Sequence, residues 1–378
     1  MDVMVSVTLL TYNHADYVRQ TLEGIVKQKT NFKFEVIVGD DCSKDSTQEI
    51  LREYGEKYPD IFNMVLRPEN IGATKNLYDL LKRCKGKYIA GLEGDDYWTD
   101  ENKLQYQVDF MESHTEYIGC SHDVVMIDQN GDVFYQNSKY LKGCHWTFYK
   151  NEYTYEDYQK WTLPGQGSTY LYRNIFLNPK HDYSIIEKAS PMVGDMTLML
   201  LIITQGKWYF MKGVTMTAYR YITYLGGTNW ASWIRTKNRS YVDFLFRYNL
   251  ENYARRVLRR KLNLFPQKLE LYRNAESVVK WSGGKENEEI LENIKKIARP
   301  HLKYVICNKL IKLFETIFLP TITYAIRVGE VKCDDEKLNN STWSDFKKAV
   351  KGKTVVGFGS GLAYNEFFAK YGKKSFFG

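Results

Sequence analysis

Three carboxylates within four residues, Glu93-Gly94-Asp95-Asp96, are the clearest chemical signal in this sequence. They come directly after the apolar run Tyr88 to Leu92, which is typical of a buried strand. Carboxylates this close repel one another, and their oxygens are the ligands that hard divalent cations prefer. The cluster therefore predicts a metal site at the end of a strand. A polar turn that caps the following helix is the alternative interpretation.

The elements that must position this cluster alternate between strand and helix over the first 125 residues. Apolar runs and helical spacing predict strands over 3–10, 34–38, 64–66 and 88–92, and helices over 15–28, 46–58 and 74–84. Ser46-Thr47-Gln48-Glu49 has the pattern of a capping box. This order is typical of an α/β fold with a doubly wound, parallel sheet.

Polar residues follow three of the predicted strands. These are Thr11-Tyr12-Asn13 after the first, Asp40-Asp41 after the second and Glu93 to Asp96 after the fourth. Ligands of doubly wound sheets bind beyond the carboxyl ends of the strands. We therefore expect the three groups to share one site.

The rest of the chain is divided by pattern. Asn130-Gly131 predicts a two-residue hairpin turn, followed by a strand over 168–172, a helix over 195–205 and a strand over 208–219. From about residue 232 the pattern is helical and basic. A polar linker at 334–340 leads to a β-α unit with Gly357, Gly359 and Gly361. We expect domains at 1–230, 231–333 and 334–378, the last an incomplete Rossmann-like unit, because one β-α unit cannot bury its own sheet face.

Charge is concentrated in one segment of the chain. The net charge is +8, and residues 237–315 carry 18 Lys or Arg against nine Asp or Glu. This segment favours an anionic partner such as a membrane surface, with a solvated helical face as the alternative. We found no secretory signal, no apolar run long enough for a membrane span and no paired-cysteine motif. These features favour a cytoplasmic protein, peripheral at the inner face of the cell membrane.

Four motifs in order resemble the family 2 inverting glycosyltransferases with the GT-A fold. They are Val5 to Asn13, Glu35 to Thr47 with its Asp-Asp-x-Ser-x-Asp-x-Thr pattern, Asn70 to Asn76, and Glu93 to Asp96 at the family's DxD position. The resemblance covers about residues 3 to 225. It implies a GT-A catalytic domain with a mostly parallel central sheet and flanking helices, followed here by the helical segment and the partial Rossmann-like unit.

The resemblance also implies a donor site for a nucleotide-sugar, expected to be UDP-linked, with Mn2+ or Mg2+ as cofactor. Its residues would be Thr11, Tyr12, Asn13, Asp40, Asp41, Lys75, Glu93, Gly94 and Asp95, with Asp95 and Asp96 on the metal. Two positions depart from the family pattern. Glu93 stands where Asp is usual, so Asp95 is the expected first ligand. Lys75 stands where Arg is usual, which keeps the charge but loses the bidentate geometry.

Asp195 matches the family's catalytic carboxylate, and Tyr219-Arg220 and Gly226-Gly227 also follow the family pattern. The resemblance implies that Asp195 is the general base that deprotonates the acceptor hydroxyl, with an N-cap role as the alternative. The expected acceptor is a saccharide or lipid-linked saccharide of bacterial polysaccharide assembly, and no nucleic-acid partner is expected. The alternatives are a metal-dependent nucleotidyl or phosphosugar transferase and a non-catalytic protein that binds nucleotide-sugar or membrane.

Overall fold

The computed structural model describes residues 2–135, 150–178, 181–191, 193–221, 238–298 and 301–318. The chain divides into two compact units, Met1–Ile294 and Lys295–Gly378. The predicted linker and β-α unit at 334–378 lie outside the described residues, as does the Gly226-Gly227 motif. The domain boundaries at 230 and 333 stay predictions. No helix among the described residues is long and apolar enough to cross a membrane.

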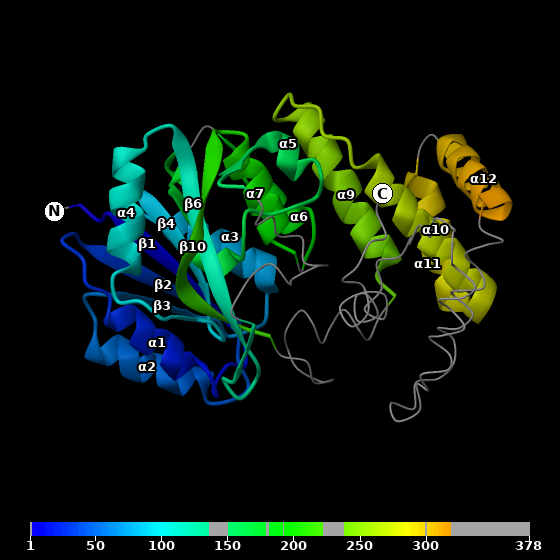
Figure 1. Ribbon diagram of the computed structural model, residues 1–378. Helices are drawn as coiled ribbons and strands as arrows, with labels where there is room; N and C mark the ends of the chain where they lie inside the picture. The colour runs from blue at the N-terminus through cyan, green and yellow to red at the C-terminus, as the bar shows by residue number, and fades with distance from the viewer. Residues whose placement is uncertain are drawn as a thin grey trace, which may run out of the picture. The chain divides into compact units, whose positions relative to one another are not determined.

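The first part of unit 1 has the predicted alternation of strands and helices (Figure 1). Its elements are β1 (Val5–Thr11), α1 (Val18–Val26), β2 (Phe34–Asp40), α2 (Thr47–Lys57), β3 (Phe62–Leu66), α3 (Ala73–Arg83) and β4 (Tyr88–Glu93). The predicted β-α-β-α-β-α-β order is therefore confirmed, with differences of a few residues at the ends.

The prediction of a capping box at α2 is wrong in its details. Ser46 occupies the N-cap position, but its side chain makes no capping hydrogen bond. The Asp45 carboxylate instead accepts the Thr47 backbone N–H at 3.0 Å and the Ala15 backbone N–H at 3.0 Å. One carboxylate thus caps α2 and ties it to the loop after β1, a tertiary contact that the local pattern does not contain.

The second part of unit 1 completes the sheet and its cover. Its elements are β5 (Tyr97–Trp98), α4 (Lys103–Ser113), β6 (Tyr117–Ile127), β7 (Val133–Tyr135), β8 (Glu152–Tyr153), α5 (Tyr155–Tyr158), the 3-10 turns η2 (Gly167–Thr169) and η3 (Ile175–Leu177), β9 (Leu171–Arg173), α6 (Ile185–Lys188), α7 (Asp195–Ile203) and β10 (Lys207–Arg220). The predicted hairpin exists, but its turn is longer than two residues. Ile127 pairs with Val133, and Asp128 accepts the backbone N–H groups of Asn130 and Asp132.

The strands form a single sheet with the order β3-β2-β1-β4-β9-β6-β10-β5. Strands β3, β2, β1 and β4 are parallel, and so are β6 and β10. The short strands β5, β7, β8 and β9 pair antiparallel. Because the longest ladders are parallel, the expected α/β architecture with a mostly parallel central sheet is confirmed.

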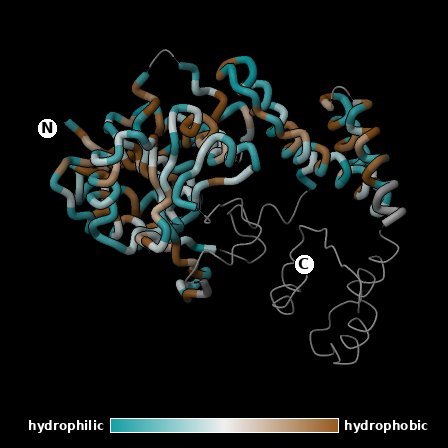
Figure 2. Tube along the Cα trace, turned by 45° about the horizontal axis from the view of Figure 1, so that its top comes forward, coloured by the Kyte–Doolittle hydropathy of each residue, from teal (hydrophilic) through white to brown (hydrophobic). Residues whose placement is uncertain are grey.

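Two hydrophobic cores lie on opposite faces of the sheet. Apolar side chains of α1, α2 and α4 form one core, and those of α3, α6 and α7 form the other, as the placement of the helices in Figure 1 indicates. The strands between them are buried on both faces, which explains their nearly continuous apolar runs. In Figure 2 the helices alternate between brown and teal along their length, as expected for helices that bury one face.

The predicted helical segment is confirmed as α9 (Ser240–Arg256), α10 (Phe265–Ser282), α11 (Lys285–Ile297) and α12 (His301–Phe318). Phe246, Leu250 and Ala254 of α9 belong to the same core as α3 and α7. Burying these side chains fixes α9 against the sheet domain, so the basic segment begins as part of unit 1.

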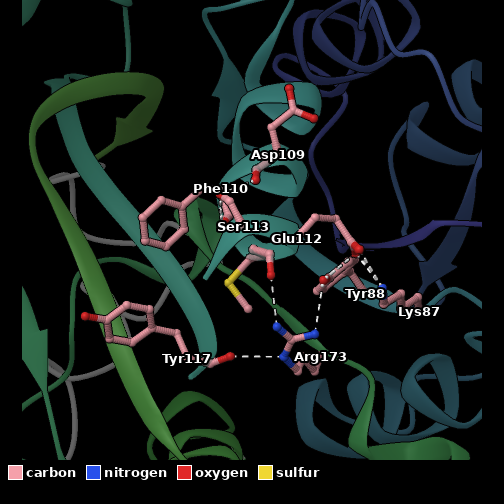
Figure 3. A network of polar contacts seen from close by, with 9 residues as sticks. Lys87, Tyr88, Asp109, Phe110, Glu112, Ser113, Tyr117 and Arg173 are labelled. Carbon is pink, nitrogen blue, oxygen red and sulfur yellow. Dashed lines mark hydrogen bonds and ion pairs between the residues drawn. The ribbon is translucent and has the colours of Figure 1, made fainter. Parts of the chain in front are cut away.

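A polar network fixes α4 and β9 near the start of β4, as Figure 3 shows. The Arg173 guanidinium donates to the carbonyl oxygens of Met111 at 2.9 Å and Tyr117 at 3.0 Å, and to the Tyr88 hydroxyl at 3.2 Å. Glu112 accepts from that hydroxyl and pairs with Lys87. The network lies at the amino end of β4, and the acidic cluster follows its carboxyl end.

Candidate active site

The structure brings the three predicted polar groups to one edge of the sheet. Strand β1 lies between β2 and β4, and its register pairs Thr11 with Asp40 and Leu10 with Glu93. From β1 the chain continues to β2 on one side and reaches β4 on the other. This reversal of strand order is the position at which doubly wound sheets bind their ligands.

Asp40 is completely buried and saturated with donors. Its carboxylate accepts hydrogen bonds from the Thr11 hydroxyl at 2.9 Å, from the Ser43 backbone N–H at 3.0 Å and hydroxyl at 2.5 Å, and from the Gln48 amide at 2.6 Å. Four donors match the four lone-pair positions of a carboxylate. In this structure, therefore, Asp40 fixes the turns after β1 and β2.

Asp41 is also buried, and it fixes the loop before α3. Its two oxygens accept the backbone N–H groups of Ile71 at 2.8 Å and Gly72 at 3.0 Å, while its carbonyl accepts from the Asn70 amide. Gly72 has φ +92°, a left-handed conformation that favours glycine. The Asn70-Ile71-Gly72 motif thus forms a tertiary contact with the Asp-Asp motif through hydrogen bonds to Asp41.

Asn13 joins the turn after β1 to the turn after β2. It has φ +54°, which asparagine tolerates better than most residues. Its side-chain oxygen accepts the Lys44 backbone N–H at 2.7 Å, and its own N–H donates to the Ser43 hydroxyl at 2.9 Å. Tyr12 beside it is half-buried. Lys75 is exposed on the first turn of α3 and forms no ion pair among the described residues.

The acidic cluster after β4 differs from the Asp40-Asp41 pair. One oxygen from each of Glu93, Asp95 and Asp96 lies within 4.8 Å of the others. Asp95 is buried, yet its Oδ1 has no hydrogen-bond partner within the described part of the chain. A buried carboxylate oxygen without a donor is costly unless a cation neutralises it. The residues therefore fit a divalent cation, with Asp95 and Glu93 offering the least occupied oxygens.

Asp96 is held by three donors. The Gln166 amide and the Ser168 hydroxyl donate to its Oδ2 at 3.0 and 2.5 Å, and the Arg220 backbone N–H donates to its Oδ1 at 2.9 Å. Burial raises the pKa of Asp96, and repulsion from Asp95 and Glu93 adds to this, while the Ser168 and Arg220 bonds oppose it. Its assignment as a metal ligand stays a prediction. Gln166 and Ser168 fall in a stretch whose sequence shows no sign of this role.

Arg220 follows the family pattern in sequence, but its contacts come from the fold. Its guanidinium donates to the carbonyl oxygens of Asp95 at 3.1 Å and Asp128 at 3.0 Å and to the Gln20 side chain at 2.9 Å. It also lies over the Tyr17 ring, 4.5 Å from the centroid. Arg220 thus ties the acidic loop to α1 and to the β6–β7 turn, which restricts the position of Asp95.

Gly94 allows the acidic loop to lie against the turn after β1. A Cβ atom at this position would come within 2.7 Å of both Thr11 Cγ2 and His14 Nδ1. The Gly94 backbone N–H donates to the Leu10 carbonyl at 2.8 Å, and the Thr21 hydroxyl lies 2.9 Å from the Gly94 carbonyl. Glycine is therefore required for this close approach.

Asp195 begins α7, and the structure places it near the acidic cluster. Its Oδ1 accepts the Met196 backbone N–H at 2.7 Å. Burial among protein atoms raises the pKa of Glu93 to about 8, with further contributions from Asp95 and Asp195. Burial also raises the pKa of Asp195. Protein atoms crowd both side chains on several sides, which raises their pKa values. Each side chain nevertheless keeps an exposed face. These are carboxylates that a solvent-borne ligand can reach.

Comparison with known proteins agrees with this geometry. Residues 6–177 match the family model described as Glycosyl transferase family 2. The chain is 43% identical over 126 residues to an uncharacterised protein of Mycobacterium tuberculosis, covering 33% of this chain and 36% of that protein. It is 38% identical over 108 residues to the putative teichuronic acid biosynthesis glycosyltransferase TuaG of Bacillus subtilis, covering 29% of this chain and 42% of that protein. The matches thus span less than half the length of these relatives.

Among solved structures, the chain is similar to S. aureus TarS 1-349 in complex with UDP, with 17% sequence identity and a TM-score of 0.43. That alignment covers 80% of this chain and 92% of the TarS chain. The family match includes β1 to β4, the acidic loop and β9. The N-terminal part of this chain, residues 6–177, therefore belongs to glycosyl transferase family 2.

Proposed function

We propose that this chain is a metal-dependent glycosyltransferase that moves a sugar from a nucleoside-diphosphate sugar to an acceptor hydroxyl. The observation that carries the proposal is the buried Asp95 oxygen, which has no donor among the described residues, at the strand-order reversal of a family 2 domain. At the same edge, four donors saturate Asp40, and Asp41 holds the 70–72 loop through two. A buried acid with no donor from the described part of the chain, beside acids that hold loops, indicates a site built for a cation.

A divalent cation, Mn2+ or Mg2+, fits this donor set because all of its ligand atoms are carboxylate oxygens. Asp95 and Glu93 would hold it, with Asp96 as a further ligand. When bound, such a cation neutralises the negative charge that develops on a departing diphosphate. The protein's own contribution is positional, since Arg220, Gln166 and Ser168 fix the backbone and side chains of the loop.

Asp195 is the proposed general base. Its pKa is raised by burial, so its carboxylate accepts a proton more readily than an ordinary aspartate. It would take the acceptor hydroxyl proton while the oxygen forms a bond to the anomeric carbon and the bond to the diphosphate breaks. A single displacement of this kind inverts the anomeric configuration. Repulsion from Asp195 contributes to the raised pKa of Glu93, which supports a position for the base close to the cation site.

The donor is proposed to be a UDP-sugar, with the nucleotide near the turns after β1 and β2. Thr11, Tyr12 and Asn13 are the proposed contacts on the first turn. Of the predicted Asp40 or Asp41, Asp41 is the proposed contact on the second turn, because two of its four lone-pair positions are left. Their own hydrogen bonds make these turns rigid before a ligand arrives, which lowers the entropic cost of binding. Lys75, exposed and without an ion pair among the described residues, is proposed to contact the diphosphate.

The acceptor is proposed to be a saccharide or lipid-linked saccharide in the assembly of a bacterial surface polysaccharide. The similarity to TuaG, named as a putative teichuronic acid biosynthesis glycosyltransferase, supports this setting. The basic segment at 237–315 supports contact with an anionic membrane surface, and a cytoplasmic location at the membrane is proposed with it.

A donor screen tests the proposal. The full chain is incubated with UDP-, GDP- and dTDP-sugars, with and without Mn2+, and released nucleoside diphosphate is measured. We expect release from a UDP-sugar that requires the metal and disappears in Asp95→Asn. Equal release with EDTA and with Mn2+ would remove the metal from the proposal. Release of monophosphate or pyrophosphate instead would indicate nucleotidyl or phosphosugar transfer.

A further inference from the structure

Five cationic side chains gather where α9 ends. Arg255 and Arg256 occupy its last turn, and Arg259, Arg260 and Lys261 follow within five residues. All five are exposed, and none forms an ion pair within the described part of the chain. We call these five residues the basic knuckle. Some other exposed cations of the chain, such as Arg19 and Lys29, pair with acids.

Stabilisation of α9 explains the presence of only some of these five cations. Cations in the last turn of a helix are stabilised by its dipole, which accounts for Arg255 and Arg256. Arg259 lies beyond the helix and has φ +54°. This left-handed conformation is costly for a residue with a Cβ atom, and glycine adopts it more readily. An arginine held there against its backbone preference indicates a use for its charge.

The backbone beneath the basic knuckle is anchored. The Lys261 carbonyl accepts a hydrogen bond from the Tyr155 hydroxyl at 3.2 Å, and the Arg260 N–H donates to the Ala254 carbonyl at 2.9 Å. Leu262 and Leu264, which follow directly, are buried in the core. Such anchoring presents the cations from a fixed surface, so little entropy is lost when an anionic partner binds.

An apolar side chain stands among the charges. Val257 is 54% exposed, between Arg256 and Arg259 in sequence. Cations around a protruding aliphatic group suit the boundary between lipid headgroups and acyl chains. Nucleic-acid surfaces instead use aromatic side chains for stacking on bases, and residues 255–261 contain none.

We propose that the basic knuckle docks this protein on a membrane surface rich in anionic lipid headgroups. Arg255, Arg256, Arg259, Arg260 and Lys261 contact the headgroup phosphates, and Val257 reaches the acyl boundary. Docking would bring the domain beside a lipid-linked acceptor. The proposal rests on the membrane contact proposed above for residues 237–315 and narrows it to five cations. The surface is narrower than the basic segment as a whole, because Lys268 on α10 is buried and paired with Glu251.

Vesicle sedimentation of the full chain tests the proposal. Vesicles of phosphatidylcholine alone are compared with equimolar phosphatidylcholine and phosphatidylglycerol. We expect binding only to the anionic vesicles, and weaker binding as salt rises. The double variant Arg259→Gly with Arg260→Gln should bind about 25-fold more weakly, since each cation at such a surface contributes about fivefold. Absence of binding by the parent chain, or knuckle-dependent binding to duplex DNA in its place, would overturn the proposal.

A matched control removes two charges elsewhere. Lys33 and Lys212 are exposed and form no ion pair among the described residues, so Lys33→Gln with Lys212→Gln has the same net charge as the knuckle variant. We expect the control to bind within about twofold of the parent, because long-range charge contributes little beyond a Debye length. Equal weakening of both variants would show general charge attraction and contradict a localised surface.

Arg259→Gly separates docking from folding. Glycine relieves the left-handed strain, so this single variant should melt at a temperature no lower than the parent while binding anionic vesicles about fivefold more weakly. Nucleoside diphosphate release with a soluble acceptor should be unchanged, so failure of docking and failure of the proposed transfer give different results. Unchanged vesicle binding by this variant and by the double variant would remove the basic knuckle from membrane contact.

Discussion

Two groups of carboxylates lie at the same edge of the sheet and differ in their partners. Asp40 and Asp41, after β2, accept hydrogen bonds from hydroxyl, amide and backbone donors that the fold supplies. The acids after β4 have fewer hydrogen-bond donors: Asp95 Oδ1 has none in the ranges that the structure describes, and the pKa of Glu93 is raised to about 8. Asp195 across the site also has a raised pKa.

This difference separates carboxylates that hold loops from carboxylates that are available to a ligand. A saturated carboxylate has little capacity left for a ligand and stabilises the loops that donate to it. An unsaturated one in a crowded position is stabilised only when a cation or a proton arrives. The first group should therefore respond to mutation in stability, and the second in activity and metal affinity.

The largest effect is expected for Asp195→Asn. The amide cannot accept the acceptor proton, so kcat should fall by about 10²- to 10⁴-fold while donor and Mn2+ affinities stay within about twofold. Steady-state kinetics and calorimetric titration of the donor measure the two quantities. Asp60→Asn, at an exposed position, serves as the control. Gly194 is the N-cap of α7, so a rate equal to the parent's would leave Asp195 only its hydrogen bond to the Met196 N–H in the first turn.

The next effect is expected for Asp95→Asn. The amide keeps the shape of the side chain but removes the charge that holds the cation, so Mn2+ affinity should fall by more than about a hundredfold. Manganese binding is followed by electron paramagnetic resonance, and folding by circular dichroism. Asp41→Asn is the informative comparison, because it should leave Mn2+ affinity unchanged. If both variants lost the metal equally, the distinction between the two groups would fail.

Arg220→Gln should lower the Mn2+ affinity, although Arg220 is not itself a proposed metal ligand. Loss of the bonds to the Asp95 and Asp128 carbonyls frees the acidic loop, and supporting residues of metal sites typically contribute about ten- to a hundredfold in affinity. The measurement is again Mn2+ titration. Arg220→Lys keeps the charge but not the planar fork, so only partial recovery is expected. Parent-like affinity in both variants would show that the loop holds its position unaided.

Asp41→Asn should reduce stability. One oxygen becomes an amide N–H group that faces a backbone N–H of Ile71 or Gly72, which leaves a buried donor unpaired. The expected loss is about 1–3 kcal/mol in the free energy of unfolding, measured by urea denaturation. Stability equal to that of the parent would show that Asp41 is not needed to hold the 70–72 loop.

Lys103 gives the last prediction, which concerns the pH dependence of stability. Its buried ammonium has no hydrogen-bond partner within the described part of the chain, and burial lowers its pKa to about 7. The unfolded chain binds this proton up to pH 10.5, the folded chain only to about 7. Stability should therefore rise with pH between these values, by at most about 1.4 kcal/mol per unit.

Lys103→Met should remove that slope and be more stable than the parent at pH 7, because an apolar side chain has no charge to desolvate. Urea denaturation at pH 7 and pH 9 measures both effects, and Lys33→Met at an exposed position is the control. Parallel pH dependence in parent and Lys103→Met would contradict the lowered pKa. His122, whose pKa burial lowers to about 3, stays neutral throughout this range.

Local patterns predicted most of the first seven elements, because apolar runs and helical spacing reflect burial directly. They failed where a neighbour distant in sequence competes. The capping box at Ser46 is replaced by Asp45, whose carboxylate also reaches Ala15. The predicted strand from 168 begins only at Leu171, because Ser168 turns to donate to Asp96.

The sequence by itself determined which residue types could do chemistry and roughly where they lie, since strand ends and acidic clusters can be read from local order. Only the tertiary structure decided which carboxylates remain available. Asp40, Asp41, Asp95 and Asp96 look alike in sequence, and their donors come from residues up to 124 positions away, as with Arg220 and Asp96. Hydrogen bonds form between atoms within about 3 Å of each other. Contacts in space, rather than order along the chain, therefore distinguish a carboxylate that holds a loop from one that can bind a metal.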